Sequence, residues 1–171
     1  MSIDQSMFKP LGFTTHDLVQ RLGKDVQEVF RSMAGIEDIL PTQMQIEPVT
    51  DFEHSVTAMV GLAGTYNGIV CLHTPINLAM FFTASMLGTA VTEYNDDVQD
   101  ALGEISNMIA GSLKNQLSMS GSDIKMSVPS VVTGDKYFCS PGNKSGTITL
   151  SFSLGIDLFL VGVTLNMNLP Q

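Results

Sequence analysis

Residues 96–117 restrict the fold more than any other segment, because their pattern predicts a long helix with two different sides. At about 100° per residue, apolar residues at spacings of three and four fall on one side of an α-helix. The apolar residues of this segment are Val98, Ala101, Leu102, Ile105, Met108, Ile109 and Leu113. Asn95 or Asp96 is expected to cap the helix. We therefore expect the apolar side to pack in the core.

Start and stop signals predict two further helices. Thr14 or Thr15 can cap a helix that runs to about Ala34, where Gly35 ends it. A second, very apolar helix is predicted over residues 75–88. The residues of this second helix that we expect to be buried are Leu78, Ala79, Phe81, Phe82, Met86 and Leu87.

The other segments have the apolar alternation or the turn signals of β-strands. The predicted strands are residues 44–49, 56–62, 69–73, 124–133, 147–154 and 158–167. Asn67-Gly68 predicts a hairpin, because Asn-Gly is the favoured two-residue turn and both positions tolerate positive φ. Pro129 indicates an edge position or a bulge, because proline cannot donate a ladder hydrogen bond.

The order of these elements repeats along the chain. A helix, a strand containing a proline and a long hairpin occur twice, with Pro48 in the first half and Pro129 in the second. We therefore predict an α+β fold with a pseudo-twofold internal repeat. It would have an antiparallel sheet of about six strands and helices mainly on one face.

Composition and length narrow the class of protein. A chain of 171 residues is the size of one domain, so residues 1–171 are expected to form a single domain. A net charge of −9 argues against nucleic acid or an anionic membrane as partner, because both are bound through clustered Lys and Arg. A signal peptide, a bilayer-length apolar run and a CxxC pair are not found. These features predict a cytoplasmic protein that is not inserted in a membrane.

The side of the 96–117 helix that does not face the core carries a line of polar residues. Asp100, Glu104, Asn107 and Gly111 fall within one narrow sector. Glu104 and Asn107 are three residues apart, so their Cβ atoms lie about 5 to 6 Å from each other and both can reach one small target. A carboxylate can hold a cation, and a carboxamide can hold a water molecule in one orientation. The pair suits in-line attack of water on a phosphoryl group carried by a partner.

The first long helix carries a related pair. When the two helices are aligned on Gly35 and Gly111, Glu28 corresponds to Glu104. In the same alignment, Arg31 takes the place of Asn107. The Glu-x-x-Asn pair is intact only in the second helix, which is therefore the favoured functional site.

Asp100-x-x-x-Glu104-x-x-Asn107, a following glycine and Pro129 resemble the signature of the CheC, CheX and FliY phosphatases of bacterial chemotaxis. The chain is most similar to the CheX members, because one copy of the pair is intact. The order of elements agrees over nearly the whole chain, including Gly61-Leu-Ala-Gly64 before the apolar helix.

This resemblance implies a hydrolase that removes the aspartyl-phosphate of a phosphorylated CheY-like receiver domain. Glu104 would pair with the regulator's active-site lysine, and Asn107 would orient the attacking water. Asp100 and Gly111 would belong to the partner-binding surface. Magnesium would be held by the regulator, and this chain would bind no metal and no cofactor. The resemblance also implies a homodimer.

Other functions remain open at this stage. Exposed Asp, Glu, Asn and Gly on a helix are also what a solvated helix face contains. A non-catalytic adaptor of the same fold could bind a regulator, a receptor-modifying enzyme or the flagellar switch. An enzyme for a small molecule would need a deep pocket with convergent polar groups, which the sequence does not predict. A metal site at His16, His54 and His73 is not expected, because they lack zinc-type spacing.

Overall fold

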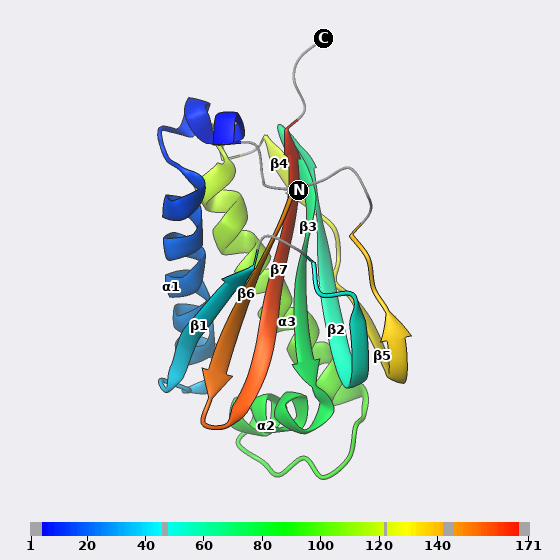
Figure 1. Cartoon of the computed structure of the whole chain (residues 1–171). Coiled ribbons are helices and arrows are strands. Elements are labelled where there is room, and N and C mark those ends of the chain that lie inside the picture. Colours follow the sequence, from blue (N-terminus) through cyan, green and yellow to red (C-terminus); the bar gives the residue numbers. More distant parts are fainter. Residues whose placement is uncertain (1–4, 46–47, 122, 142–145, 168–171) are drawn as a thin grey trace.

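The computed structural model of the chain describes residues 5–45, 48–121, 123–141 and 146–167. Helices and strands follow one another along this part of the chain (Figure 1). In chain order they are a 3-10 helix η1 (Gln5–Leu11), α1 (Thr15–Ala34), β1 (Ile39–Gln45), β2 (Asp51–Gly64), β3 (Tyr66–Pro75), α2 (Ile76–Leu87), α3 (Asp96–Leu117), β4 (Ile124–Met126), β5 (Ser130–Phe138), β6 (Gly146–Leu154) and β7 (Asp157–Met167). None of the helices within these ranges is long and apolar enough to cross a bilayer.

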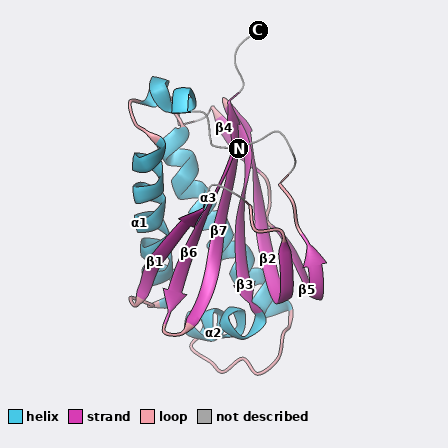
Figure 2. Cartoon of the chain, viewed as in Figure 1, coloured by secondary structure: helices cyan, strands magenta, loops and turns pink. Residues whose placement is uncertain are grey.

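The strands form one antiparallel sheet of seven strands, with the order β1-β6-β7-β3-β2-β4 and with β5 also paired to β2. The α-helices lie together on one face of this sheet, and the other face carries none of them (Figure 2). The predicted α+β class is therefore confirmed, with one strand more than the expected six.

The strand pairing has the twofold pattern that the internal repeat predicts. Strand β1 from the first half pairs with β6, the first strand of the second hairpin. Strand β5 from the second half pairs in the same way with β2, the first strand of the first hairpin. The two hairpins meet in the middle of the sheet through β3 and β7. Each half thus completes the sheet of the other.

Local capping explains where the long helices begin and end. The Thr14 hydroxyl accepts a hydrogen bond from the Asp17 amide (3.2 Å), and the Asp17 carboxylate accepts one from the Thr14 amide (2.8 Å). Gly35 ends α1 with a φ of 66°, which glycine adopts without strain. Asn95 caps α3 by accepting a hydrogen bond from the Val98 amide at 3.2 Å. The bounds predicted for both helices are confirmed.

The first hairpin forms, but its turn is not at Asn67-Gly68. Leu62 already lies opposite Gly68, so Asn67 and Gly68 belong to β3 and the chain reverses earlier, around Thr65. Gly64 supplies the positive φ, at 148°, and the Asn67 side chain accepts a hydrogen bond from the Gly64 amide at 3.0 Å. The glycine that the turn needs is therefore Gly64, and Asn67 supports the turn with its side chain.

Two strands predicted to contain a proline have different bounds in the structure. The expected strand over residues 124–133 is divided at Pro129, because β4 ends before it and β5 begins after it. Both pieces pair with β2. Pro48 follows β1 instead of lying within a strand, and β1 contains Pro41. The part of the prediction at residues 46–47 lies outside the described residues.

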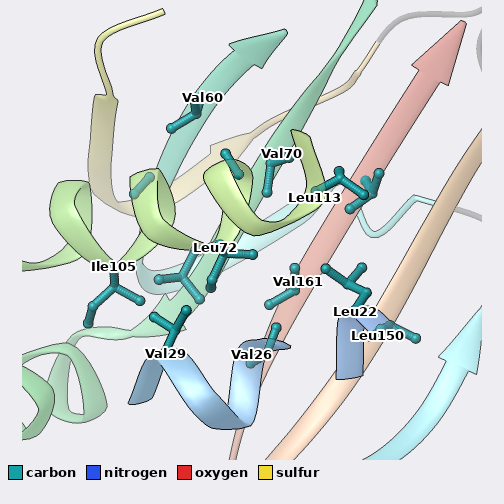
Figure 3. Packing of buried hydrophobic residues seen from close by; sticks show 14 of the residues in the cluster. Leu22, Val26, Val29, Val60, Val70, Leu72, Ile105, Leu113, Leu150 and Val161 are labelled. Atoms are coloured by element: carbon teal, nitrogen blue, oxygen red, sulfur yellow. The ribbon is translucent and has the colours of Figure 1, made fainter. Parts of the chain in front are cut away.

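The core lies between the sheet and the helices α1 and α3. Figure 3 shows side chains of both helices directed toward the strands. The labelled residues of this cluster, all buried, are Leu22, Val26, Val29, Val60, Val70, Leu72, Ile105, Leu113, Leu150 and Val161. Burial of this apolar surface, at about 25 cal/mol per Å², is the main force that holds α3 to the sheet.

Three apolar side chains that we expected in the core are exposed instead. The exposed fractions are 50% for Phe81, 52% for Leu87 and 43% for Met108. Helix α2 buries Leu78, Ala79, Phe82 and Thr83, so it packs with one side even though it is apolar all round. Met108 lies at the boundary between the buried stripe and the polar line of α3. The prediction was wrong at these positions because apolar composition does not indicate which side of a helix is covered.

Gly68 supports a test of the central pairing between β3 and β7. A Cβ atom at this position would collide with the carbonyl oxygen of Thr164 on β7. We expect Gly68→Ala to lower the free energy of unfolding by about 1 to 3 kcal/mol, the usual cost of overpacking. Gly23 in α1 is the control, because a Cβ there meets no atom within 4 Å, and Gly23→Ala should raise stability by about 1 kcal/mol. Urea unfolding of both variants measures the difference, and equal effects would contradict the close approach of β3 and β7.

Candidate functional site on helix α3

The polar line of α3 lies at the surface of the molecule. Asp100 and Glu104 are exposed, and Asn107 and Gly111 are half-buried. Within the described part of the chain, the side chains of Asp100, Glu104 and Asn107 make no hydrogen bond or ion pair. Their side chains are therefore free to contact another molecule, as the pattern of residues predicted.

Two open grooves run beside this line, and Glu104 lines both of them. The groove on the side of β5 is lined by Gln99, Asp100, Gly103, Glu104, Pro129 and Val131. The groove on the side of α2, which we call the α2–α3 groove, is lined by Met86, Leu87, Asp97, Asp100, Ala101 and Glu104. Glu104 thus stands on a ridge between two depressions and is accessible from both sides.

The buried side of α3 determines the direction of this ridge. Leu102, Ile105 and Ile109 are fully buried against the core. Near the end of the helix, the Gln116 side chain donates a hydrogen bond to the Asp25 carboxylate of α1. Because one side of α3 is held in this way, the opposite side must project outward.

Gly103 and Pro129 form a contact that sequence reasoning missed. A Cβ atom at Gly103 would lie 3.4 Å from the Pro129 Cβ atom, so the proline packs closely against the helix next to Glu104. The division between β4 and β5 occurs at this point. The signal in the sequence is a glycine in mid-helix, which costs about 1 kcal/mol relative to alanine. It does not identify the contact by itself, because Gly23 and Gly111 are also helical glycines and a Cβ atom there would meet nothing within 4 Å.

The related pair on α1, Glu28 and Arg31, forms an ion pair within its own helix. The Arg31 guanidinium donates to the Glu28 carboxylate, with a shortest distance of 2.6 Å. The Glu28 carboxylate is therefore already paired within its own helix, whereas Glu104 has no cationic neighbour of this kind. That the second helix carries the site stays a prediction.

The surroundings of Glu104 are acidic. Asp96 and Asp97 lie in the first turn of α3, where the partial positive charge of the helix N-terminus favours carboxylates. In the part of the chain that the structure describes, neither groove is lined by a Lys or Arg. A partner that approaches this surface is therefore favoured if it carries positive charge.

Comparison with known proteins decides the family. The family model described as chemotaxis phosphatase CheX matches residues 56–153. The chain belongs to the CheX family. The matched region contains Asp100, Glu104, Asn107 and Gly111, whereas α1 lies outside it.

Individual CheX proteins agree with this membership. The CheY-P phosphatase CheX of Thermotoga maritima is 28% identical over 120 residues, which cover 68% of this chain and 76% of that protein. The crystal structure of CheX from Desulfovibrio desulfuricans has a TM-score of 0.77 at 29% identity, covering 88% of this chain and 99% of that one. CheX of Borrelia burgdorferi, solved as a CheX–CheY–BeF3–Mg complex, shares the fold with a TM-score of 0.72 at 19% identity, covering 88% and 98%.

The histidines of this CheX-family chain are dispersed. His73 on β3 is buried, its Nδ1 atom lies 2.8 Å from the Thr57 hydroxyl oxygen, and its ring stacks on Phe52 with centroids 4.2 Å apart. Burial lowers the pKa of His73 to about 4, so its imidazole is neutral at pH 7. Among the described residues, no group of three or more His, Cys, Asp and Glu could hold a metal ion.

The buried imidazole predicts a pH dependence of stability. The pKa of His73 is lowered from 6.5 to about 4 in the folded chain, so between these values the unfolded chain binds more protons. Stability should therefore fall as the pH falls through this window, with His73 contributing about 2 to 3 kcal/mol of the loss between pH 7 and pH 4.5. His73→Gln should remove that part of the loss, whereas His16→Gln, at an exposed position, should keep it. Urea unfolding at both pH values measures this loss. An equal loss of unfolding free energy between pH 7 and pH 4.5 in His73→Gln and in the parent would contradict the prediction.

Proposed function

We propose that this chain hydrolyses the aspartyl-phosphate of a CheY-like receiver domain, with Glu104 and Asn107 as its catalytic residues. The observation that carries the proposal is an acid and an amide one helical turn apart on α3: Glu104 is exposed, Asn107 is half-buried, and neither side chain is paired among the described residues. Both lie in the region that matches the CheX family. The name of the Thermotoga maritima relative, CheY-P phosphatase, supports the same reaction.

The two side chains would have different roles. The Glu104 carboxylate would form an ion pair with the lysine of the receiver's active site and so fix the position of the phosphoryl group. The Asn107 carboxamide would donate to and accept from one water molecule, holding it in line with the phosphorus–oxygen bond that breaks. Water adds its oxygen to phosphorus, the aspartate carboxylate leaves, and inorganic phosphate is released.

Magnesium would belong to the receiver domain in this reaction. A bound metal ion neutralises the charge of the phosphoryl oxygens during transfer. The Borrelia burgdorferi complex contains CheX, CheY, BeF3 and Mg, which supports a partner that brings its own metal. This chain would then need no cofactor.

Asp100 and Gly111 would complete the contact surface. Asp100 is exposed one turn before Glu104, and its charge would attract the basic part of a receiver. A Cβ atom at Gly111 would meet nothing within 4 Å in this chain, so the glycine is not required by internal packing. Because Gly111 has no side chain, the backbone of the partner could approach α3 closely at this position.

We further propose that the chain acts in the cytoplasm as a single domain and forms a homodimer through an edge strand. Strands β1 and β5 lie at the two sides of the sheet, and unpaired edges of this kind can pair with a second chain. Light scattering after size exclusion should give twice the mass of the 18.4 kDa chain. A monomeric mass at micromolar concentration would contradict the dimer.

Removal of either catalytic side chain tests the proposed reaction. We expect Glu104→Ala and Asn107→Ala each to lower kcat by about a hundredfold or more, the usual cost of losing one positioned polar group. Both should unfold at nearly the parent urea concentration, because neither side chain makes an internal hydrogen bond within the described ranges. The measurement is phosphate release from a panel of phosphorylated receiver domains.

Glu28→Ala on α1 is the matched control, because Glu28 is an exposed glutamate at the related position and is already paired with Arg31. It should keep the parent rate. If Glu104→Ala and Asn107→Ala also keep the parent rate, the assignment of catalytic residues is wrong. If the parent binds a phosphorylated receiver without releasing phosphate, the non-catalytic adaptor is the better description.

A further inference from the structure

Helix α2 is unusual for a helix at the surface of an acidic protein. From Thr74 to Thr92 the chain carries no charged residue. Two large apolar side chains of this helix, Phe81 and Leu87, are nevertheless about half exposed. Exposed apolar surface next to a functional site commonly marks a contact with another protein.

The exposed end of α2 lies directly beside the ridge of α3. Leu87 and Met86 form the apolar wall of the α2–α3 groove, and Asp97, Asp100 and Glu104 contribute to its lining. Met108, four residues after Glu104 on α3, adds a further exposed apolar side chain. The groove therefore combines an apolar wall with three carboxylates.

This combination defines the chemistry of what can bind there. Among the described residues, no Lys or Arg lines the groove, so none of them neutralises its carboxylates. An apolar side chain that enters it would cover Leu87, and a basic group beside that side chain would meet Asp97 and Asp100. A second copy of this chain is not the proposed occupant, because the homodimer proposed above forms through an edge strand of the sheet.

We infer that the α2–α3 groove is a specificity-determining contact for the receiver domain, which would insert an apolar side chain flanked by basic residues. The inference rests on the proposed function, because Glu104 and Leu87 line the same groove, so a receiver that engages Glu104 from the side of α2 also lies against Leu87. Leu87 has no polar group to offer the phosphoryl oxygens. Its contribution is to binding and not to the chemical step.

A negative charge introduced at Leu87, in the apolar wall of the α2–α3 groove, tests this inference. Leu87→Glu should raise the KM for the phosphorylated receiver by roughly tenfold or more, as expected for a central apolar contact, with kcat changed less than about twofold. Leu87→Ala, which is the milder change, should raise KM by roughly threefold to tenfold. Glu104→Ala should instead lower kcat much more than it raises KM.

Ile156→Glu is the control for adding a negative charge at an exposed apolar position. Ile156 is 99% exposed in the turn between β6 and β7 and lines neither groove. It should keep the parent KM. Circular dichroism and urea unfolding should show that the three variants are folded, and Leu87→Ala carries the test if Leu87→Glu is not.

A second measurement separates this inference from the proposed reaction. Binding is titrated with a receiver domain loaded with magnesium and beryllium fluoride, which takes the place of the phosphoryl group and is not hydrolysed. Weaker binding by the Leu87 variants than by Ile156→Glu supports the groove, even if the parent releases no phosphate. Equal binding by all of them overturns the groove and leaves the reaction standing. A parent that neither binds nor hydrolyses any receiver overturns both.

Discussion

The packing of the apolar stripe of α3 against the sheet is the contact on which the other features depend. Leu102, Ile105 and Ile109 are fully buried, and a helix of 22 residues that buries one side must direct its other side away from the core. The position of Glu104 and Asn107 follows from this burial and not from any bond that they make themselves. The buried and the polar residues of α3 therefore lie on opposite sides of one element, so that polar residues can change on one side without a loss of core packing on the other.

The twofold arrangement of the sheet makes the difference between its two long helices informative. The helix of each half packs on the same face of the sheet, and each half contributes one strand beside the hairpin of the other. On α1 the Arg31 guanidinium occupies the Glu28 carboxylate, whereas the amide of Asn107 leaves Glu104 available. The residue at one corresponding position, Arg31 or Asn107, thus distinguishes a helix whose glutamate is paired from a helix whose glutamate is available.

The sequence was sufficient where short-range chemistry decides the structure. Thr14, Gly35 and Asn95 determine helix ends through contacts within a few residues, and the period of α3 identified its exposed side. It was not sufficient where distant segments decide. Gly68 was predicted to form the hairpin turn, but it lies within β3, where the close approach of β7 leaves no space for a side chain. The turn is instead formed near Gly64. The exposure of Leu87 depends on which side of α2 the core covers, a choice that an apolar sequence leaves open.

The contact between Gly103 and Pro129 has a consequence for the space beside Glu104. Neither residue can donate or accept through a side chain, so the wall of the β5-side groove is held at this point by van der Waals contact alone. A Cβ atom at position 103 would lie 3.4 Å from the Pro129 Cβ atom, so a methyl group would just touch the proline and a longer side chain would need more space than the contact leaves. The absence of a side chain at position 103 therefore lets Pro129 lie directly against the helix in the β5-side groove. A larger residue at this position would change the shape of that groove without replacing Asp100 or Glu104.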